Sequence, residues 1–226
     1  MVNWFQFIRP ARKVLGPMVD NKILLKIFIK DFIVKDNTIN NPKLFSIEGP
    51  TTQAHPNIEK VWAEAETRGV TQLFNLLGQL GKKDKLEIIE MSDGFNHWDT
   101  NMIVLGGQAM KSMDFYKVMD NVAYSMDENN IYNNENGEII PRDSKGEYGY
   151  GIILKSKNPQ MGNNGIGILL GGYGTLGTKA AIYYLCNNIS KLGKEFGNKY
   201  FGLIVRAKAS AGEQSVKRLK EFDKLF

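Results

Sequence analysis

The sequence has little of what disulfide frameworks and zinc sites need. Its 226 residues include one cysteine and two histidines. Zinc sites take several cysteine, histidine or carboxylate ligands, so we expect no metal site, and a disulfide framework is excluded. The one cysteine, Cys186, lies in a helical run, where a buried and unreactive thiol is expected. A chain without disulfides suits a reducing cytoplasm.

Long apolar runs and strongly one-sided charge are missing as well. No apolar run approaches the length that spans a bilayer. The formal net charge is +5, and the basic residues of the last third alternate with apolar ones, as on a solvated helix face. Nucleic-acid binding takes a basic stripe with aromatic stacking partners, so we expect no nucleic-acid partner. The mild positive charge favours small anionic ligands without specifying one.

The first twenty residues are predicted to be a separate segment. Residues 1–20 combine aromatic residues with the basic residues Arg9, Arg12 and Lys13. The pattern predicts a helix that docks on the domain or on a neighbouring subunit, which leaves a homo-oligomer open. A membrane-surface helix is the alternative, and a signal peptide is disfavoured because the charges follow the apolar part. Residues 21–226 are enough for one α/β domain.

Glycine, by contrast, is plentiful and clustered. The 23 glycines include Gly171, Gly172, Gly174 and Gly177, which follow the apolar run 166–170 and precede a helical run. A strand that ends in glycines and turns into a helix leaves N–H groups unpaired at the positive end of the helix dipole, a natural seat for phosphate. Glycine also leaves room for the ligand to approach the backbone. The other explanation is a glycine-rich turn that only packs tightly.

The spacing of this cluster matches known fingerprints in part. It contains G-x-G-x-x-G in the strand–turn–helix context of dinucleotide-binding folds. The acidic residue that would bind the ribose is missing, because the next apolar run ends in Arg206. The order Thr178-Lys179 is also the reverse of the P-loop order. The motif therefore predicts phosphate or nucleotide binding without the full fingerprint of either class.

A second apolar run, 102–105, ends in Gly106-Gly107 and continues into a helical stretch that begins at Gln108. In open parallel sheets, ligands bind beyond the carboxyl ends of the strands, where two such loops can face each other. We therefore expect a three-layer Rossmann-like α/β fold, with a mostly parallel sheet and helices on both faces. Asn136-Gly137 predicts an antiparallel hairpin at the sheet edge. Alternatively, Gly106 and Gly107 only permit close packing.

The remaining elements follow from periodicity and from glycine and proline breakers. The chain has long connections at 35–57 and 156–165, and within them the segment from Leu44 to His55 and the pair Asn158-Pro159 are expected to flank the ligand crevice. The predicted strands are 22–29, 86–91, 148–155 and 200–208, and the predicted helices are 58–80 and 213–226.

The segment Leu170-Gly-Gly-Tyr-Gly-Thr-Leu-Gly-Thr178 resembles the P-G-G-x-G-T-x-x-E loop of the SLOG superfamily. Members of that superfamily include the lysine-decarboxylase-like (LOG-type) phosphoribohydrolases that activate cytokinins, and sensors of NAD-derived nucleotides in prokaryotic defence. Leu170 replaces the proline, and Thr178 replaces the glutamate that the hydrolases need. The resemblance thus implies a Rossmann-like fold that binds a nucleotide, and it does not imply hydrolysis of that type.

Together these patterns favour a ligand-sensing module that binds a phosphorylated nucleotide, which the resemblance suggests is derived from NAD; no other cofactor is indicated. Lys179, just past the glycine turn, and Arg206 are the cations expected near the phosphate. The expected ligand contacts are Gly106, Gly107, Gln108, Asn158, Gly171, Gly172, Tyr173, Gly174, Thr175, Lys179 and Arg206.

Catalysis is the alternative to sensing. The enzyme would be a hydrolase or transferase that cleaves the N-glycosidic bond of a nucleotide, nucleoside or NAD. Glu64 or Glu66 would then stabilise a ribosyl cation, whereas in the simpler explanation these residues only suit the start of a helix. Asp93 and His97 form an acid–base pair without a visible nucleophile, so the catalytic residues stay unassigned.

Overall fold

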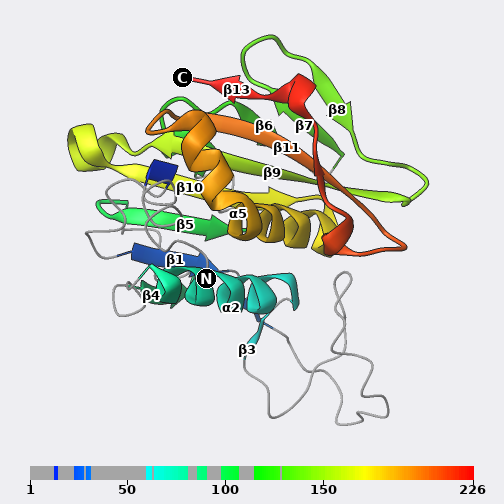
Figure 1. The fold of residues 1–226 in the computed structure, drawn as a ribbon, viewed down its shortest axis with the longest axis horizontal. Helices are drawn as coiled ribbons and strands as arrows, with labels where there is room; N and C mark the ends of the chain where they lie inside the picture. Colours follow the sequence, from blue (N-terminus) through cyan, green and yellow to red (C-terminus); the bar gives the residue numbers. More distant parts are fainter. Residues whose placement is uncertain are drawn as a thin grey trace.

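A computed structural model describes residues 13–14, 23–27, 29–31, 60–62, 64–80, 86–90, 98–106, 115–127 and 129–226. These residues form one large mixed sheet, one small antiparallel sheet and a separate pair of strands (Figure 1). The large sheet has the strand order β12-β11-β9-β10-β5-β1-β4, and β13 also pairs with β11. Its strands are β1 (Ile23–Ile27), β4 (Leu86–Glu90), β5 (Asn101–Leu105), β9 (Tyr148–Lys157), β10 (Ile166–Gly172), β11 (Phe201–Lys208), β12 (Lys217–Arg218) and β13 (Lys224–Leu225).

The other elements lie around this sheet. Strands β6 (Tyr124–Met126), β7 (Asn130–Asn133) and β8 (Ile139–Pro141) form the small sheet, and β2 (Ile29–Asp31) pairs with β3 (Lys60–Trp62). The helices are α2 (Glu64–Gln79) and α5 (Gly174–Phe196), with the short 3-10 helices η4 (Pro159–Asn164), η5 (Glu213–Ser215) and η6 (Lys220–Phe222). In the described part of the chain, no helix has the length and apolar character needed to cross a membrane.

The expectation of a mostly parallel Rossmann-like sheet is wrong. Strands β4, β1, β5 and β10 are parallel to their neighbours, but β9 is antiparallel to both β10 and β11. Strands β12 and β13 are antiparallel to β11 as well. The direct connection 158–165 returns the chain beside β9, and adjacent antiparallel strands need no helical crossover. Strand β9 is thereby inserted between β10 and β11, which run in the same direction.

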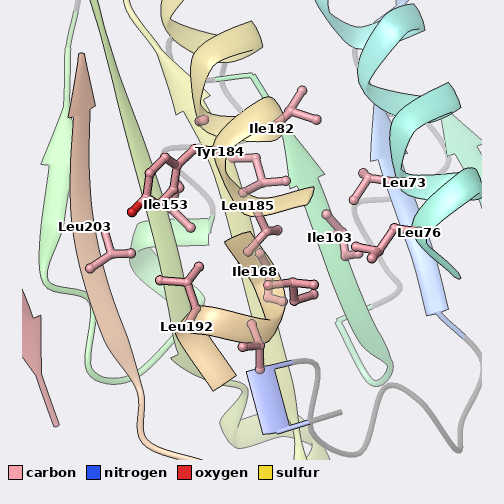
Figure 2. Packing of buried hydrophobic residues seen from close by; sticks show 14 of the residues in the cluster. Leu73, Leu76, Ile103, Ile153, Ile168, Ile182, Tyr184, Leu185, Leu192 and Leu203 are labelled. Carbon is pink, nitrogen blue, oxygen red and sulfur yellow. The ribbon is translucent and has the colours of Figure 1, made fainter. Parts of the chain in front are cut away.

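The expectation of helices on both faces also needs correction. Helices α2 and α5 lie together on one face of the large sheet (Figure 1). The core on this side joins Leu73 of α2 and Leu185 of α5 to strand residues such as Ile153 and Ile168 (Figure 2). On the opposite face, the small sheet and a helical turn at residues 115–118 pack against the other side chains of the same strands.

The hairpin predicted from Asn136-Gly137 is confirmed, but its place differs from the prediction. Strands β7 and β8 pair antiparallel around this turn, where Gly137 has a φ of 72°. The Asn136 side-chain oxygen accepts a hydrogen bond from the Glu138 N–H at 2.9 Å. Ile131 and Ile140 point into the core with the large sheet, so the hairpin covers a face instead of extending from an edge.

The predicted last helix, 213–226, does not form. This segment instead makes η5, β12, η6 and β13 along the edge of β11. Arg218 explains the preference, because its side chain is 4% exposed and donates to both oxygens of Glu195, at 2.8 and 2.9 Å. It also pairs with Asp223 and stacks on the ring of Phe196 at 4.8 Å. Tertiary ion pairing therefore overrides the helical pattern of the sequence.

Close contact between α5 and the sheet depends on glycines. A Cβ atom at Gly177 would lie 2.2 Å from the carbonyl oxygen of Tyr150 on β9. A Cβ atom at Gly151 would lie 2.4 Å from the Gly177 oxygen, and one at Gly172 would lie 2.4 Å from the Gly177 carbonyl carbon. These neighbours are backbone atoms, which cannot rotate out of the way. Side chains at these three positions would push the helix off the sheet.

We predict that Gly177→Ala destabilises the protein by about 1–3 kcal/mol or more, the usual cost of overpacking a core. Gly78→Ala is the matched control, because Gly78 is also in a helix and its Cβ atom would meet nothing within 4 Å. It should leave stability unchanged or raise it by up to ~1 kcal/mol. Urea unfolding would measure both changes. Equal stability of the two variants would contradict the packing explanation.

Lys155 on β9 is a buried charge that main-chain oxygens solvate. Its side chain is 1% exposed, and its Nζ donates to the carbonyl oxygens of Lys13 at 2.9 Å and Asn198 at 3.2 Å. Burial lowers the pKa of this amine to about 8. Val14, next to Lys13, is buried in the core that contains α5. Lys155 therefore links residues 13–14 and the end of α5 to the sheet; the rest of segment 1–20 lies outside the described residues.

The lowered pKa predicts a specific dependence of stability on pH. Between the folded value of about 8 and the ordinary value of 10.5, the unfolded chain binds more protons at Lys155 than the folded chain. The free energy of unfolding should therefore rise with pH across this window, and the full cost of burying the charge should be present below it. Urea unfolding of the wild type and of Lys155→Met would show the rise as an increase with pH in the wild-type free energy of unfolding relative to that of the variant. A constant difference would contradict the prediction.

Candidate functional site

The ends of β5 and β10 form one continuous edge of the large sheet. The two strands are parallel neighbours with Leu105 opposite Leu170. The N–H of Gly106 donates to the Leu170 carbonyl oxygen at 2.9 Å. Gly106, which follows β5, therefore lies beside the glycine end of β10, as expected from the two similar motifs.

This edge also contains the point where the strand order reverses. Strand β1 lies between β4 and β5. The chain goes from β1 through α2 to β4 on one side of β1, and then to β5 on the other side of β1. All three strands are parallel, and their carboxyl ends lie at the same edge. In open α/β sheets such a reversal leaves a crevice between the two central strands, where ligands commonly bind. Gly106 lies at this position.

The start of α5 supplies hydrogen-bond donors to the same edge. Tyr173 is the N-cap residue, and its side chain makes no capping hydrogen bond. The N–H of Gly177 donates to the Tyr173 carbonyl oxygen at 3.2 Å, so the N–H groups of Gly174, Thr175 and Leu176 precede the first intrahelical bond. Gly174 is exposed and has a φ of 57°, and a Cβ atom there would meet nothing within 4 Å. This turn can approach an anion without steric obstruction.

The glycines of the turn therefore have two different roles. Gly172 and Gly177 are buried, and packing of α5 against β9 already requires glycine at both positions, as in the tight-packing explanation of the motif. Gly149 and Gly151 on β9 belong to the same contact, and the sequence interpretation missed them. Glycine at alternate strand positions puts both on one face, so the Tyr-Gly-Tyr-Gly run beginning at Tyr148 was the available signal.

Tyr173 anchors the turn to the rest of the fold. Its side chain is 5% exposed, and its hydroxyl donates to the Ile140 carbonyl oxygen of β8 at 3.2 Å. Its N–H donates to the Tyr150 carbonyl oxygen at 2.9 Å. Burial raises the pKa of this phenol well above its usual value. Tyr173 thus connects the glycine turn to the small sheet, and its hydroxyl is already engaged.

The two expected cations do not flank the turn together. Lys179 lies between α5 and α2, close to Arg68, Gln72 and Glu213. Arg68 and Glu213 form an ion pair there at 3.5 Å. Arg206 lies at the same sheet edge as the turn but two strands away, on β11.

Asn158 lies at the opposite edge of the sheet, which corrects its expected place beside the crevice. Its side-chain amide donates to the carbonyl oxygens of Trp98 at 2.7 Å and Thr100 at 3.0 Å, just before β5 begins. The length of β10 separates it from the glycine turn, roughly 20 Å at the rise of a strand. Asn158 is fully buried and ties the η4 connection to the amino ends of the strands.

Several sequence predictions lie outside what the structure describes. These are Gly107, Gln108, His55, Asp93, His97 and the connection 35–57. Glu64 and Glu66 are in the first turn of α2, and their side chains are not described. Helix α2 connects β1 to the parallel strand β4, so its amino end lies at the carboxyl edge of these strands. Burial raises the pKa of the Cys186 thiol to about 12, which keeps it protonated and unreactive at neutral pH.

Comparison with protein-family models, curated proteins and solved structures finds no match to this chain.

The anchoring role of Tyr173 can be tested separately from ligand binding. Tyr173→Phe removes the hydroxyl and leaves the Ile140 carbonyl oxygen without this donor. We expect a loss of about 1 kcal/mol in the free energy of unfolding, typical for one buried hydrogen bond. Thermal unfolding would measure it. Unchanged stability would mean that the hydrogen bond contributes nothing to the fold.

Proposed function

We propose that this chain binds a phosphorylated nucleotide at the shared edge of β5 and β10, as a ligand-sensing module. The observation that supports this best is the start of α5. Three N–H groups precede the first intrahelical bond beside the exposed Gly174. A phosphate there would accept hydrogen bonds and meet the positive end of the helix dipole. The strand-order reversal beside Gly106 supports the same location.

Sensing fits the turn better than hydrolysis of the LOG type. Thr178 stands at the position of the glutamate in the resembling hydrolases and is 5% exposed. A threonine hydroxyl does not ionise near neutral pH, so it cannot replace that carboxylate. The resemblance of the glycine loop to that of the SLOG superfamily further suggests that the bound nucleotide is derived from NAD.

A charge placed at Gly174 tests the proposal. Gly174→Asp should weaken AMP binding by at least about tenfold, or ~1.4 kcal/mol, because its carboxylate would occupy the anion seat. Gly174→Asn fills nearly the same space without charge and should weaken binding less. Both residues tolerate a positive φ. Isothermal titration with AMP, ADP-ribose and adenosine would give the affinities, and adenosine should bind more weakly than AMP.

The control uses the other end of the same helix. Gly197 also has a positive φ, 61°, and open space around its Cβ position. Gly197→Asp should therefore bind AMP like the wild type. Normal AMP binding by Gly174→Asp, or equal loss in Gly197→Asp, would count against the proposed site.

Cleavage of an N-glycosidic bond is the second candidate, because α2 brings Glu64 and Glu66 to the same sheet edge. The sensing proposal predicts that incubation with NAD or AMP releases no free base, which chromatography would detect. Base release that disappears in Glu64→Gln or Glu66→Gln would instead establish the enzyme.

A further inference from the structure

The large sheet carries a basic and aromatic surface near its carboxyl edge. Arg206 and Lys208 lie near the end of β11, and Lys217 of β12 pairs with Arg206. On the other side of β11, Tyr150 pairs with Arg206 and Tyr148 pairs with Lys208. We call these five residues the basic–aromatic surface.

All five side chains point away from α5. Directly paired residues of antiparallel strands point to the same face, so one strand fixes the orientation of the others. On β11, Val205 packs in the core beside α5 while Ile204 packs in the opposite core, and Arg206 and Lys208 alternate in step with Ile204. Likewise, Arg218 of β12 stacks on Phe196 of α5. Neighbouring residues of a strand point to opposite faces, so Lys217 points away from α5.

The three charged side chains of this surface, Arg206, Lys208 and Lys217, are all positive. Arg206 and Lys217 are directly opposed like charges, an arrangement that destabilises a sheet. None of the three cations forms an ion pair with a described acidic residue. The nearby acids Asp223 and Glu213 pair with other arginines. Three cations thus lie close together here without an ion-pair partner among the described residues.

Aromatic rings lie directly beside these charges. The guanidinium carbon of Arg206 lies 4.6 Å from the centre of the Tyr148 ring. Tyr148, Tyr150 and Arg206 are half-buried, whereas Lys208 and Lys217 are exposed. The rings are thus held in place while part of their surface is open to a ligand.

We propose that the basic–aromatic surface binds single-stranded nucleic acid. Such ligands need cations for their phosphates and ring faces on which unpaired bases stack, and this surface has both. A duplex hides its base faces, and a lipid surface offers no bases to the tyrosines. The proposal departs from the expectation of no nucleic-acid partner. The sequence pattern did not indicate this surface, because the cations come from two strands and are adjacent only once β11 and β12 pair.

The test is fluorescence anisotropy with a labelled oligothymidylate of about 15 nucleotides, a size that such sites cover. The double variant Arg206→Gln, Lys217→Gln should bind about tenfold more weakly near 0.1 M salt, and the slope of log affinity against log salt should shrink by about 1.4, or 0.7 per lost phosphate contact. Tyr148→Ala should weaken binding at least about fivefold, and Tyr148→Phe should not, because it keeps the ring.

The matched control is Lys191→Gln, Lys194→Gln on the exposed side of α5, which removes the same charge from the other face. It should bind with wild-type affinity, and unfolding curves should show that all variants are folded. No binding of the oligonucleotide by the wild type, or equal losses in both double variants, would overturn the proposal. Binding of anionic vesicles with the same sensitivity to Arg206 and Tyr148 would assign the surface to lipid and would also overturn it.

This proposal does not rest on the nucleotide site. Gly174→Asp, which blocks the start of α5, should bind the oligonucleotide with unchanged affinity. Loss of oligonucleotide binding in that variant would make the glycine turn the binding site and overturn the assignment to the sheet surface.

Discussion

The contact between the first turn of α5 and the backbone of β9 determines much of this structure. Gly177 lies so close to the Tyr150 carbonyl oxygen that no side chain fits between helix and strand. The Tyr173 N–H also donates to that oxygen, so one carbonyl group fixes both the last residue before the helix and its first turn. Helix α5 must therefore begin where β10 ends and cross over β9. This path is the reason that β11 joins the sheet on the far side of β9.

The same contact accounts for both faces of the sheet. Beyond its first turn, α5 buries Leu185 and Leu192 against the large sheet and Ile182 toward α2 (Figure 2). On the other face, Tyr173 turns its ring into the second core and reaches the small sheet through Ile140. The residue before the helix thus belongs to one core and the helix to the other. Displacement of the turn would disturb both.

Local sequence patterns predicted local structure well. The apolar runs that became β5 and β10, the turn at Asn136-Gly137 and the helical run 178–192 inside α5 all depend on neighbouring residues, although α5 begins four residues before that run, at Gly174. These signals come from side-chain period and backbone freedom over a few positions, which is the range in which they are reliable. The sequence also predicted that the two glycine motifs lie close together, because parallel neighbouring strands end at the same edge of a sheet.

Properties set by distant partners were not predictable in this way. The apolar run of β9 suits a buried strand in either direction, and only the short connection after Asn158 makes it antiparallel to β10. Residues 213–226 have helical spacing, but Arg218 donates a hydrogen bond to Glu195 of α5, twenty-three positions earlier in the chain. The position of Asn158 at the far edge has the same origin, since a loop residue acquires its place from the strands that it joins.

The glycine motif shows how one spacing can arise from two physical requirements. Gly172 and Gly177 are needed because a strand and a helix touch through their backbones, whether or not a ligand binds. A Cβ atom at Gly174 would meet nothing within 4 Å, and the positive φ of this residue lets the chain turn between the other two. A helix packed this closely on a sheet brings its N–H groups to the strand ends as a consequence of the packing. The motif by itself is therefore evidence of the fold, and the proposal of a ligand rests on the open position at Gly174 and on the neighbouring reversal of strand order.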